Sequence, residues 1–461
     1  MKSGFRSLSL FSLALVALAA KPGYAVTLAV IDSGTDLKHQ DLAAKAWINA
    51  DEIAGNNADD DKNGKADDIN GWNFAEKNNQ IIDYSYLGTF SKDPYKFFEI
   101  QLKMFQGTAT PEEKQWIAEK RKDQAFLAEL QKFGNFVHGT HVAGIAARDA
   151  AQARIMGIKL IPTEVKKPFM SVVDDGIKDG EPISDTMDLL IKKGLETIAG
   201  AQGKALEPIG LYVWYEKARV ANCSFGTSVR AVKPLIAMLL SKVLKREPTD
   251  EEATKYTVYF VGKIVESGRQ FTIDAKDTFF VIAAGNDGTS NDEFPTFPAN
   301  IKRPNTISVA ATFGYARLAS FSNYGVNKVE IAAPGVGILS AIPGDEHLTV
   351  SGTSQASPFV ANVAGRVLDI NERLTFAELK RVLMETVDKK DFLRDKVASG
   401  GIANPERAVR AAELSLKMPL DDAILQSRLE VADVPTVAAT SIDEAADDSA
   451  MLIEMPSGLK L

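Results

Sequence analysis

The sequence predicts an α/β fold, with a doubly wound, mostly parallel sheet and helices on both of its faces. Short runs rich in Val and Ile recur along the chain and are apolar at consecutive positions. That pattern is typical of parallel strands buried on both faces. Helical segments separate these runs, and such an alternation of strand and helix indicates a parallel α/β sheet.

The individual elements follow from local signals in the chain. Three helices are expected to begin after Thr110, Thr249 and Thr375, because Glu follows each Thr three residues later in the capping-box pattern. The segment after Thr110 carries apolar residues among many charges and predicts one amphipathic surface helix. Six apolar runs are expected to be strands: 27–31, 155–161, 219–222, 278–283, 306–310 and 328–331.

The length of 461 residues is compatible with one large domain that carries insertions and a tail. We expect the domain over 26–416, with insertions at about 76–135 and 162–217. Residues 417–461 are acidic, rich in Ala and poor in aromatic residues. This tail is expected to be disordered or loosely packed on the domain.

The N-terminal segment, residues 1–25, resembles a secretory signal peptide. Lys2 and Arg6 give a positive start, an apolar run covers 8–20, and small residues precede a cleavage site after Ala25. Cleavage after Ala20 is the alternative, and an uncleaved anchor stays open. The chain is therefore expected to be secreted or periplasmic through bacterial export, with no stable membrane span.

Charge and cysteine content limit the classes of partner and the redox chemistry. The net charge of −8 argues against nucleic acid or an anionic membrane as a main partner. Cys223 is the one cysteine, so no intrachain disulfide can form. Protein or peptide substrates are the expected partners, and no inhibitor or partner protein can be identified.

Three short motifs carry the side chains needed for acyl transfer. Asp32 lies in Ala-Val-Ile-Asp-Ser-Gly (29–34), His138 opens His-Gly-Thr-His-Val-Ala-Gly (138–144), and Ser354 lies in Ser-Gly-Thr-Ser-Gln-Ala-Ser-Pro (351–358). A hydroxyl nucleophile, an imidazole base and a carboxylate that orients the base can attack an acyl carbon at neutral pH. Asn286, in Ala-Ala-Gly-Asn, offers an amide to the resulting oxyanion.

Each motif also has a simpler interpretation. Asp32 could open a tight turn, and Ser354 could cap a helix. His138 and His141 could form half of a metal site, although the chain has only four His. Both His138 and Ser354 are expected at helix N-termini, and Asp32 at the carboxyl end of a strand.

Taken together, these motifs resemble those of the subtilisin-like serine peptidases, in which the order is Asp, His, Ser. The similarity covers roughly 27–415, without the two insertions, and includes Phe-Ser-Asn-Tyr-Gly (321–325), Ile-Ala-Ala-Pro-Gly (331–335) and Gly-Gly-Ile-Ala-Asn (400–404). The resemblance implies a serine endopeptidase that works through an acyl-enzyme. By this resemblance, Asp32, His138 and Ser354 are the catalytic residues, and Asn286 donates a hydrogen bond to the oxyanion.

The resemblance also implies where a peptide substrate binds. Ser224, Phe225 and Gly226 correspond to the strand with which a peptide pairs in β fashion. Ala283, Ala284 and Gly285 would bound part of a side-chain pocket. These positions carry no acidic residue, so we expect the pocket to prefer uncharged, hydrophobic side chains of the substrate.

An Asp-rich loop predicts a structural calcium ion. Residues 59–68 place oxygens of Asp59, Asp61, Asn63 and Asp67, and the main chain at Lys65, around a glycine in the spacing of a calcium loop. A solvated acidic turn is the alternative. Asp41 matches a second calcium ligand of many relatives, but the loop that would complete that site is missing after Ala147.

Other functions remain to be weighed against the peptidase. An inactive family member that binds peptides or proteins is one alternative. A lipase or esterase would need Gly-x-Ser-x-Gly and a different order of residues, and Ala356 replaces the second glycine. An acid peptidase that shares the serine motif would lack His138.

Asp32 follows the expected cleavage site closely, which leaves no room for a propeptide. We therefore expect the insertion around 84–133 or the acidic tail to replace it.

Overall fold

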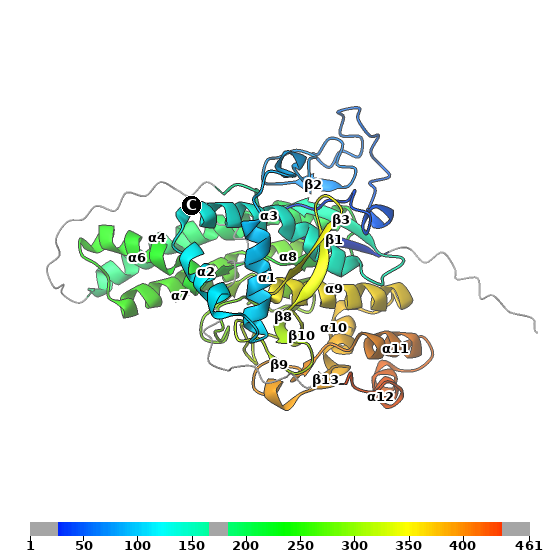
Figure 1. Ribbon diagram of the computed structural model, residues 1–461. Coiled ribbons are helices and arrows are strands. Elements are labelled where there is room, and N and C mark those ends of the chain that lie inside the picture. Colours follow the sequence, from blue (N-terminus) through cyan, green and yellow to red (C-terminus); the bar gives the residue numbers. More distant parts are fainter. Residues whose placement is uncertain (1–25, 166–182, 436–461) are drawn as a thin grey trace, which may run out of the picture.

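A ten-stranded, mostly parallel sheet forms the centre of the computed structural model, which describes residues 26–165 and 183–435 (Figure 1). The predicted fold class is confirmed. Across the sheet the strands follow the order β13 (Asp388–Lys389), β14 (Gly401–Ile402), β10 (Ile331–Pro334), β8 (Thr306–Phe313), β6 (Phe279–Ala283), β4 (Val220–Cys223), β1 (Thr27–Asp32), β3 (Arg154–Lys159) and β2 (Gly71–Asn73). The short β9 (Arg317–Leu318) pairs with β8 outside this path.

Parallel pairing around β1 decides where polar side chains gather. β1 pairs with β3 on one side and with β4 on the other, so the chain reverses its direction of winding here. In open α/β sheets a crevice forms at such a point, outside the carboxyl ends of the strands. Asp32 is the last residue of β1 and lies at that crevice.

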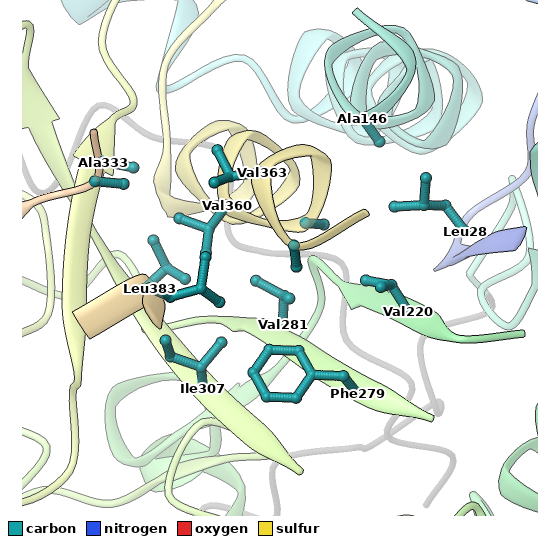
Figure 2. Packing of buried hydrophobic residues seen from close by; sticks show 14 of the residues in the cluster. Leu28, Ala146, Val220, Phe279, Val281, Ile307, Ala333, Val360, Val363 and Leu383 are labelled. Atoms are coloured by element: carbon teal, nitrogen blue, oxygen red, sulfur yellow. The ribbon is translucent and has the colours of Figure 1, made fainter. Parts of the chain in front are cut away.

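Side chains alternate between the two faces of the sheet, and each face has its own hydrophobic core. Leu28 and Val30 of β1 contribute to one core, and Ala29 and Ile31 to the other. Helix α9 crosses the first face, where Val360 packs above the strands (Figure 2). Consecutive strand residues are therefore all buried, which explains why the runs are apolar without alternation.

Helices cover both faces. The first face packs against α3 (Gln124–Ala147), α9 (Thr353–Ile370), α10 (Phe376–Glu385), α11 (Pro405–Ser415) and α12 (Leu420–Glu430). The second face packs against α4 (Asp185–Lys204), α5 (Glu207–Tyr215), α6 (Val229–Leu244), α7 (Asp250–Ser267) and α8 (Gln270–Asp274). Figure 1 shows α4, α6 and α7 grouped at the left of the molecule.

The segment 76–135 forms a small core of its own beside the sheet. Helices α1 (Asp93–Phe105) and α2 (Pro111–Lys120) pack with the first turns of α3 onto the hairpin β11 (Ile338–Ile342) and β12 (Glu346–Val350). Phe133, with 0% of its surface exposed, lies in this core. The hairpin leads directly into α9, so this added core supports the segment that precedes Ser354. The remaining short elements are η1 (Ala43–Lys45), η2 (Tyr84–Tyr86), η3 (Asp391–Leu393), β5 (Thr227–Ser228) and β7 (Thr296–Phe297).

Several sequence-based expectations are confirmed and others need correction. The capping boxes at Thr110, Thr249 and Thr375 are all present. The single helix expected after Thr110 is wrong, because α2 ends at Lys120 and Asp123 caps α3. The strand expected over 328–331 is displaced along the chain, because β10 begins only at Ile331. Residues 329–330 approach the sheet as irregular chain.

The first part of the acidic tail differs from the expected loose segment. Residues 420–430 form α12, whose Ile424 is buried against the first core. Arg407 of α11 binds the carboxylate of Asp433 at 2.6 Å, and Arg410 binds Glu430 at 2.5 Å. The described part of this segment is thus attached to the domain. The expected signal peptide (1–25) and residues 436–461 lie outside the described residues, and among the described helices none is long and apolar enough to cross a membrane.

Candidate active site

Asp32 and His138 are joined across the crevice. Asp32 is fully buried, and its Oδ1 lies 2.6 Å from Nδ1 of His138. The same oxygen accepts hydrogen bonds from the main-chain N–H of Ser33 at 2.8 Å and from its hydroxyl at 3.2 Å. These bonds fix the carboxylate. A carboxylate acceptor at Nδ1 favours the tautomer that leaves Nε2 free to take a proton.

His138 lies in the middle of α3, and its expected place at a helix N-terminus is wrong. The helix begins at Gln124, because the amphipathic segment of the added core continues into the histidine motif without a break. The helix approaches the loop after β1 very closely at Gly139. A Cβ on Gly139 would lie 2.1 Å from the carbonyl oxygen of Gly34, so only glycine fits there. This contact places His138 over Asp32.

Ser354 lies in the first turn of α9, as the sequence predicts. It is 3% exposed, and its Oγ donates a hydrogen bond to the main-chain oxygen of Ser224 at 3.3 Å. In return the hydroxyl of Ser224 donates to the main-chain oxygen of Ser354 at 3.0 Å. Ser224 follows β4, the neighbour of β1, so the serine lies at the same end of the sheet as Asp32. Rotation about χ1 is what would direct Oγ toward the imidazole.

Asn286 is held beside the start of α9 by Thr353. Its Oδ1 accepts hydrogen bonds from the N–H of Thr353 at 2.9 Å and from the hydroxyl of Thr353 at 2.8 Å. Both bonds use the amide oxygen, which leaves Nδ2 as the donor toward the crevice. The N–H groups of the first helical turn and the positive end of the helix dipole lie next to it, and both favour an anion there.

A buried polar network that the sequence analysis missed supports the serine. Asn222 of β4 donates to the hydroxyl of Ser224 at 2.9 Å and accepts from the hydroxyl of Ser357 at 2.7 Å. Asn222 and Ser357 are both 0% exposed. The network therefore couples the end of β4 to the first turn of α9. A polar residue inside the apolar strand run 219–222 was the signal that could have revealed it.

The predicted substrate-binding residues fall into two groups. Phe225 and Gly226 line an apolar cavity of about 40 Å³, together with Leu160, Gln202, Ala205, Leu206, Thr227, Ile264 and Phe297. Ser224 anchors Ser354 as described above. Ala283 is instead the last residue of β6, and Ala284 and Gly285 follow it beside α9, where the N–H of Gly285 donates to Thr353 Oγ1 at 3.2 Å.

His141 is a buried structural residue, and the interpretation as half of a metal site finds no support in its contacts. Its Nε2 lies 3.1 Å from the carbonyl of Ile338 and 3.0 Å from that of Leu348, one on each strand of the hairpin. It thereby ties α3 to β11 and β12. Burial lowers the pKa of His141 to about 3, so the ring stays neutral at physiological pH.

This neutral histidine should make the fold sensitive to acid. His141 takes up a proton near pH 6.5 in the unfolded chain but only near pH 3 in the folded chain. The free energy of unfolding therefore falls as the pH drops from 6.5 toward 3. The free energy of unfolding should decrease by roughly 1.4 kcal/mol per pH unit because of this group. Urea unfolding at pH 7, 6 and 5 would measure it. His141→Gln, which does not titrate, should show a slope smaller by that amount, and equal slopes would contradict the assignment.

The acidic loop gathers a set of oxygens that differs from the predicted one. Carboxylate oxygens of Glu52, Asp61 and Asp68 lie within 4.8 Å of one another. Asn63 adjoins them: its Nδ2 donates to Asp61 at 3.0 Å and to Asp68 at 3.0 Å. Its buried Oδ1 has no donor among the described residues. A hard cation binds such oxygens, so the residues fit calcium.

Two of the five predicted ligands, Asp59 and Asp67, accept main-chain hydrogen bonds instead. Asp59 accepts hydrogen bonds from the N–H groups of Asn63 and Gly64, at 3.0 and 2.9 Å. Asp67 accepts from the N–H groups of Gly55 and Asn57, at 2.7 and 2.9 Å, and so faces away from the cluster. The Lys65 ammonium lies 4.8 Å from the ring centre of Tyr212 and donates to the main-chain oxygen of Asn63.

Tertiary structure adds Glu216, from the end of α5, to this cluster. Its Oε1 accepts from Nδ2 of Asn63 at 2.9 Å. Burial raises the pKa of Glu216 to about 7 and also raises the pKa of Asp68. Without a cation, the concentration of carboxylates therefore disfavours full ionisation. Glu216 is distant in sequence, so no motif could have indicated it.

Comparison with known proteins assigns a family to this arrangement. The model of the subtilase family matches residues 23–406. A thermophilic serine proteinase of Bacillus sp. (strain AK1) is 44% identical over 254 residues, which cover 55% of this chain and 47% of that protein. Subtilisin-like protease 2 of Plasmodium falciparum is 29% identical over 298 residues, which cover 64% of this chain and 18% of that protein. The chain thus spans about half, or less, of the length of these relatives.

Solved structures give weaker similarity. The A-subunit of the AB5 toxin from E. coli aligns with a TM-score of 0.44 and 20% identity, over 84% of this chain and 92% of that chain. A cold adapted subtilisin-like serine proteinase aligns with a TM-score of 0.43 and 18% identity, over 83% of this chain and 90% of that one.

Proposed function

Since the chain belongs to the subtilase family, we propose that it is a serine endopeptidase that hydrolyses peptide bonds through Asp32, His138 and Ser354. The observation that carries the proposal is the 2.6 Å contact between His138 and the fully buried Asp32. Ser354 lies at the same end of the sheet, in the first turn of α9, where its Oγ donates to the main-chain oxygen of Ser224. An imidazole held by a buried carboxylate next to a hydroxyl is the apparatus of acyl transfer.

In the proposed reaction, Nε2 of His138 takes the proton of Ser354 Oγ as the oxygen attacks the carbonyl carbon of the peptide bond. The carbonyl π electrons move to its oxygen, and Nδ2 of Asn286 and the N–H of Ser354 donate to that oxyanion. The C–N bond then breaks, and His138 gives its proton to the leaving amine. Water repeats the steps on the ester and releases the acid, which regenerates the serine.

The substrate would bind in extended form along Ser224–Gly226. The apolar cavity beside Phe225 and Gly226 is lined mainly by aliphatic and aromatic groups, which supports a preference for uncharged side chains near that position. The natural substrate is a protein or peptide. Secretion through the N-terminal segment remains part of the proposal.

Active-site labelling tests the function without a known substrate. A fluorophosphonate reacts with a serine whose hydroxyl is activated, so the full chain should be labelled on the peptide that contains Ser354. Ser354→Ala should not be labelled. Ser351→Ala is the matched control, because this hydroxyl in the same motif accepts from the N–H of Gly337 and has no place in the reaction. A folded chain that takes no label and does not cleave casein would instead be a peptide-binding scaffold.

We also propose that calcium stabilises the loop 49–70. Oxygens of Asp61, Asn63, Asp68 and Glu216 would hold the ion, with Glu52 nearby. The ion would offset repulsion among these carboxylates. Rotation of the Asn63 amide would replace Nδ2, which now donates to them, by Oδ1, which would then have the ion as its partner. The ion has no part in the bond-breaking steps.

Removal of calcium should therefore lower thermal stability, and more strongly at pH 8 than at pH 6. The pKa of Glu216 is raised to about 7, so the folded state holds a proton at pH 6 that the unfolded state has lost. Stability of the calcium-free chain falls as pH rises through 7, and bound calcium should prevent that loss. Differential scanning fluorimetry of the Ser354→Ala chain, with calcium or with chelator, would measure both effects.

Asp61→Asn should lose the calcium response, whereas Asp149→Asn, at an exposed site outside the loop, should keep it. An equal response in both variants would place the ion elsewhere.

A further inference from the structure

A second cluster of metal-ligating groups lies apart from the acidic loop. Ring nitrogens of His39 and His347 and a carboxylate oxygen of Asp41 lie within 4.8 Å of one another. Nε2 of His347 is 2.7 Å from Oδ2 of Asp41, and Nδ1 of His39 is 4.0 Å from the same oxygen. The two imidazole rings meet edge to face with centres 5.3 Å apart.

The surroundings of His39 determine which of its nitrogens can bind a ligand. Nε2 lies 3.1 Å from the main-chain oxygen of Glu346, which can only accept, so this nitrogen carries the proton. Nδ1 then carries the one lone pair of the ring, which accepts the main-chain N–H of Asp41 at 3.1 Å, so a metal ion at Nδ1 would have to replace this hydrogen bond. The bond from Nε2 to a main-chain carbonyl fixes the ring as the outer contacts of metal-ligating histidines do, with Nδ1 on the side of the Asp41 carboxylate, 4.0 Å away.

Exposure differs across the cluster in a way that suits ion entry. The side chain of His39 is 0% exposed, whereas those of His347 and Asp41 are 36% and 48% exposed. The present separations of 2.7 and 4.0 Å would have to change for all three atoms to lie at the roughly 2.0–2.2 Å bonds that zinc requires, and exposed side chains are the ones that can adjust. Solvent then supplies the fourth ligand.

We propose that His39 Nδ1, Asp41 Oδ2 and His347 Nε2 bind one divalent transition-metal ion, with zinc as the fitting member. Two imidazoles and one carboxylate suit zinc, whereas calcium prefers oxygen ligands alone. Asp41, which matches a calcium ligand of many relatives although the loop completing that site is missing, would thus bind a different class of ion. The proposal does not depend on the peptidase activity.

The position of the site gives it a structural consequence. His39 and Asp41 follow the loop after β1, and His347 lies on β12, shortly before Ser354. This loop already contacts the hairpin, since the N–H of Gln40 donates to Asp345 at 2.7 Å and the N–H of Gly344 donates to Asp36 at 3.1 Å. A bound ion would add a crosslink between the segment carrying Asp32 and the segment leading to Ser354.

Metal titration of the full chain tests the site. The Ser354→Ala chain, freed of metal by chelator and then supplied with calcium, is titrated with zinc by calorimetry. Cobalt is used in a parallel titration that follows the visible absorption of tetrahedral Co²⁺. One equivalent of each ion should bind, and zinc should raise the unfolding midpoint.

His347→Gln and Asp41→Asn should weaken zinc at least as much as the ~10–100-fold that follows loss of a group that merely orients a ligand. Glu346→Gln is the matched control, because it neutralises the neighbouring carboxylate and keeps the main-chain oxygen that binds His39; its affinity should be unchanged. Asp61→Asn should also bind zinc normally. The proposal is overturned if no zinc binds, if both ligand variants keep their affinity, or if only Asp61→Asn loses it.

Discussion

Replacement of His138 by alanine is expected to lower kcat on a peptide substrate by about 10⁶-fold, the loss known when the base or the nucleophile is removed in an enzyme of this family. His138 is the histidine whose Nδ1 is held by the buried carboxylate of Asp32, and His141 is engaged by two main-chain carbonyls. His141 therefore cannot take over the proton of Ser354.

The measurement is kcat on a chromogenic peptide, with circular dichroism to establish that the variant is folded. Gln131→Ala changes the same helix two turns earlier, at a partly exposed position, and should keep the rate of the original chain. If His138→Ala loses less than about 10-fold, a loss far smaller than removal of a catalytic base produces, the base must be another group.

Asp32→Asn should separate catalysis from stability. The expected loss in kcat is about 10⁴-fold, because an amide can donate to Nδ1 of His138 and so favour the tautomer in which Nε2 carries the proton. The unfolding free energy should not fall. Oδ1 of Asp32 has its hydrogen bonds, but Oδ2 is buried with no donor among the described residues, so a neutral side chain removes the cost of a buried charge.

Urea unfolding and kcat, measured on the same preparations, would show both effects. Asp36→Asn is the contrasting control. This carboxylate accepts from the hydroxyl of Tyr84 at 2.6 Å and from the N–H of Gly344 at 3.1 Å, so its loss should weaken the fold while the chemistry continues. An Asp32→Asn chain that is both active and less stable would assign Asp32 a purely structural role.

The proposed catalytic residues were accessible from the sequence because they lie in short motifs, two of them at the ends of predictable strands and helices. Asp32 could be placed at a strand end, and Ser354 in a first helical turn, from local pattern alone. The place of His138 within α3 could not be predicted in this way. The helix is extended by residues that become helical only because their apolar side chains pack into the added core with the hairpin.

The two proposed cation sites show the same limit more sharply. Local spacing indicated an oxygen-rich loop around Asp61 and Asn63, but Asp67 is drawn away by N–H groups of Gly55 and Asn57, and Glu216 enters from a different helix. The pairing of His39 with His347 joins segments about three hundred residues apart, since the hydrogen bond from His39 to Glu346 spans 307 positions.

The sequence by itself determined the alternation of strands and helices, the capping boxes, and the three motifs with their order, because each of these depends on neighbouring residues and on the period of apolar side chains. Tertiary structure alone decided which side chains meet: Asp32 with His138, Asn286 with Thr353, and His39 with His347. These contacts join segments that are far apart in the sequence and that meet only when the helices pack onto the sheet. The hydrophobic burial that drives this packing is not directional, so the local sequence pattern does not show which side chains will meet.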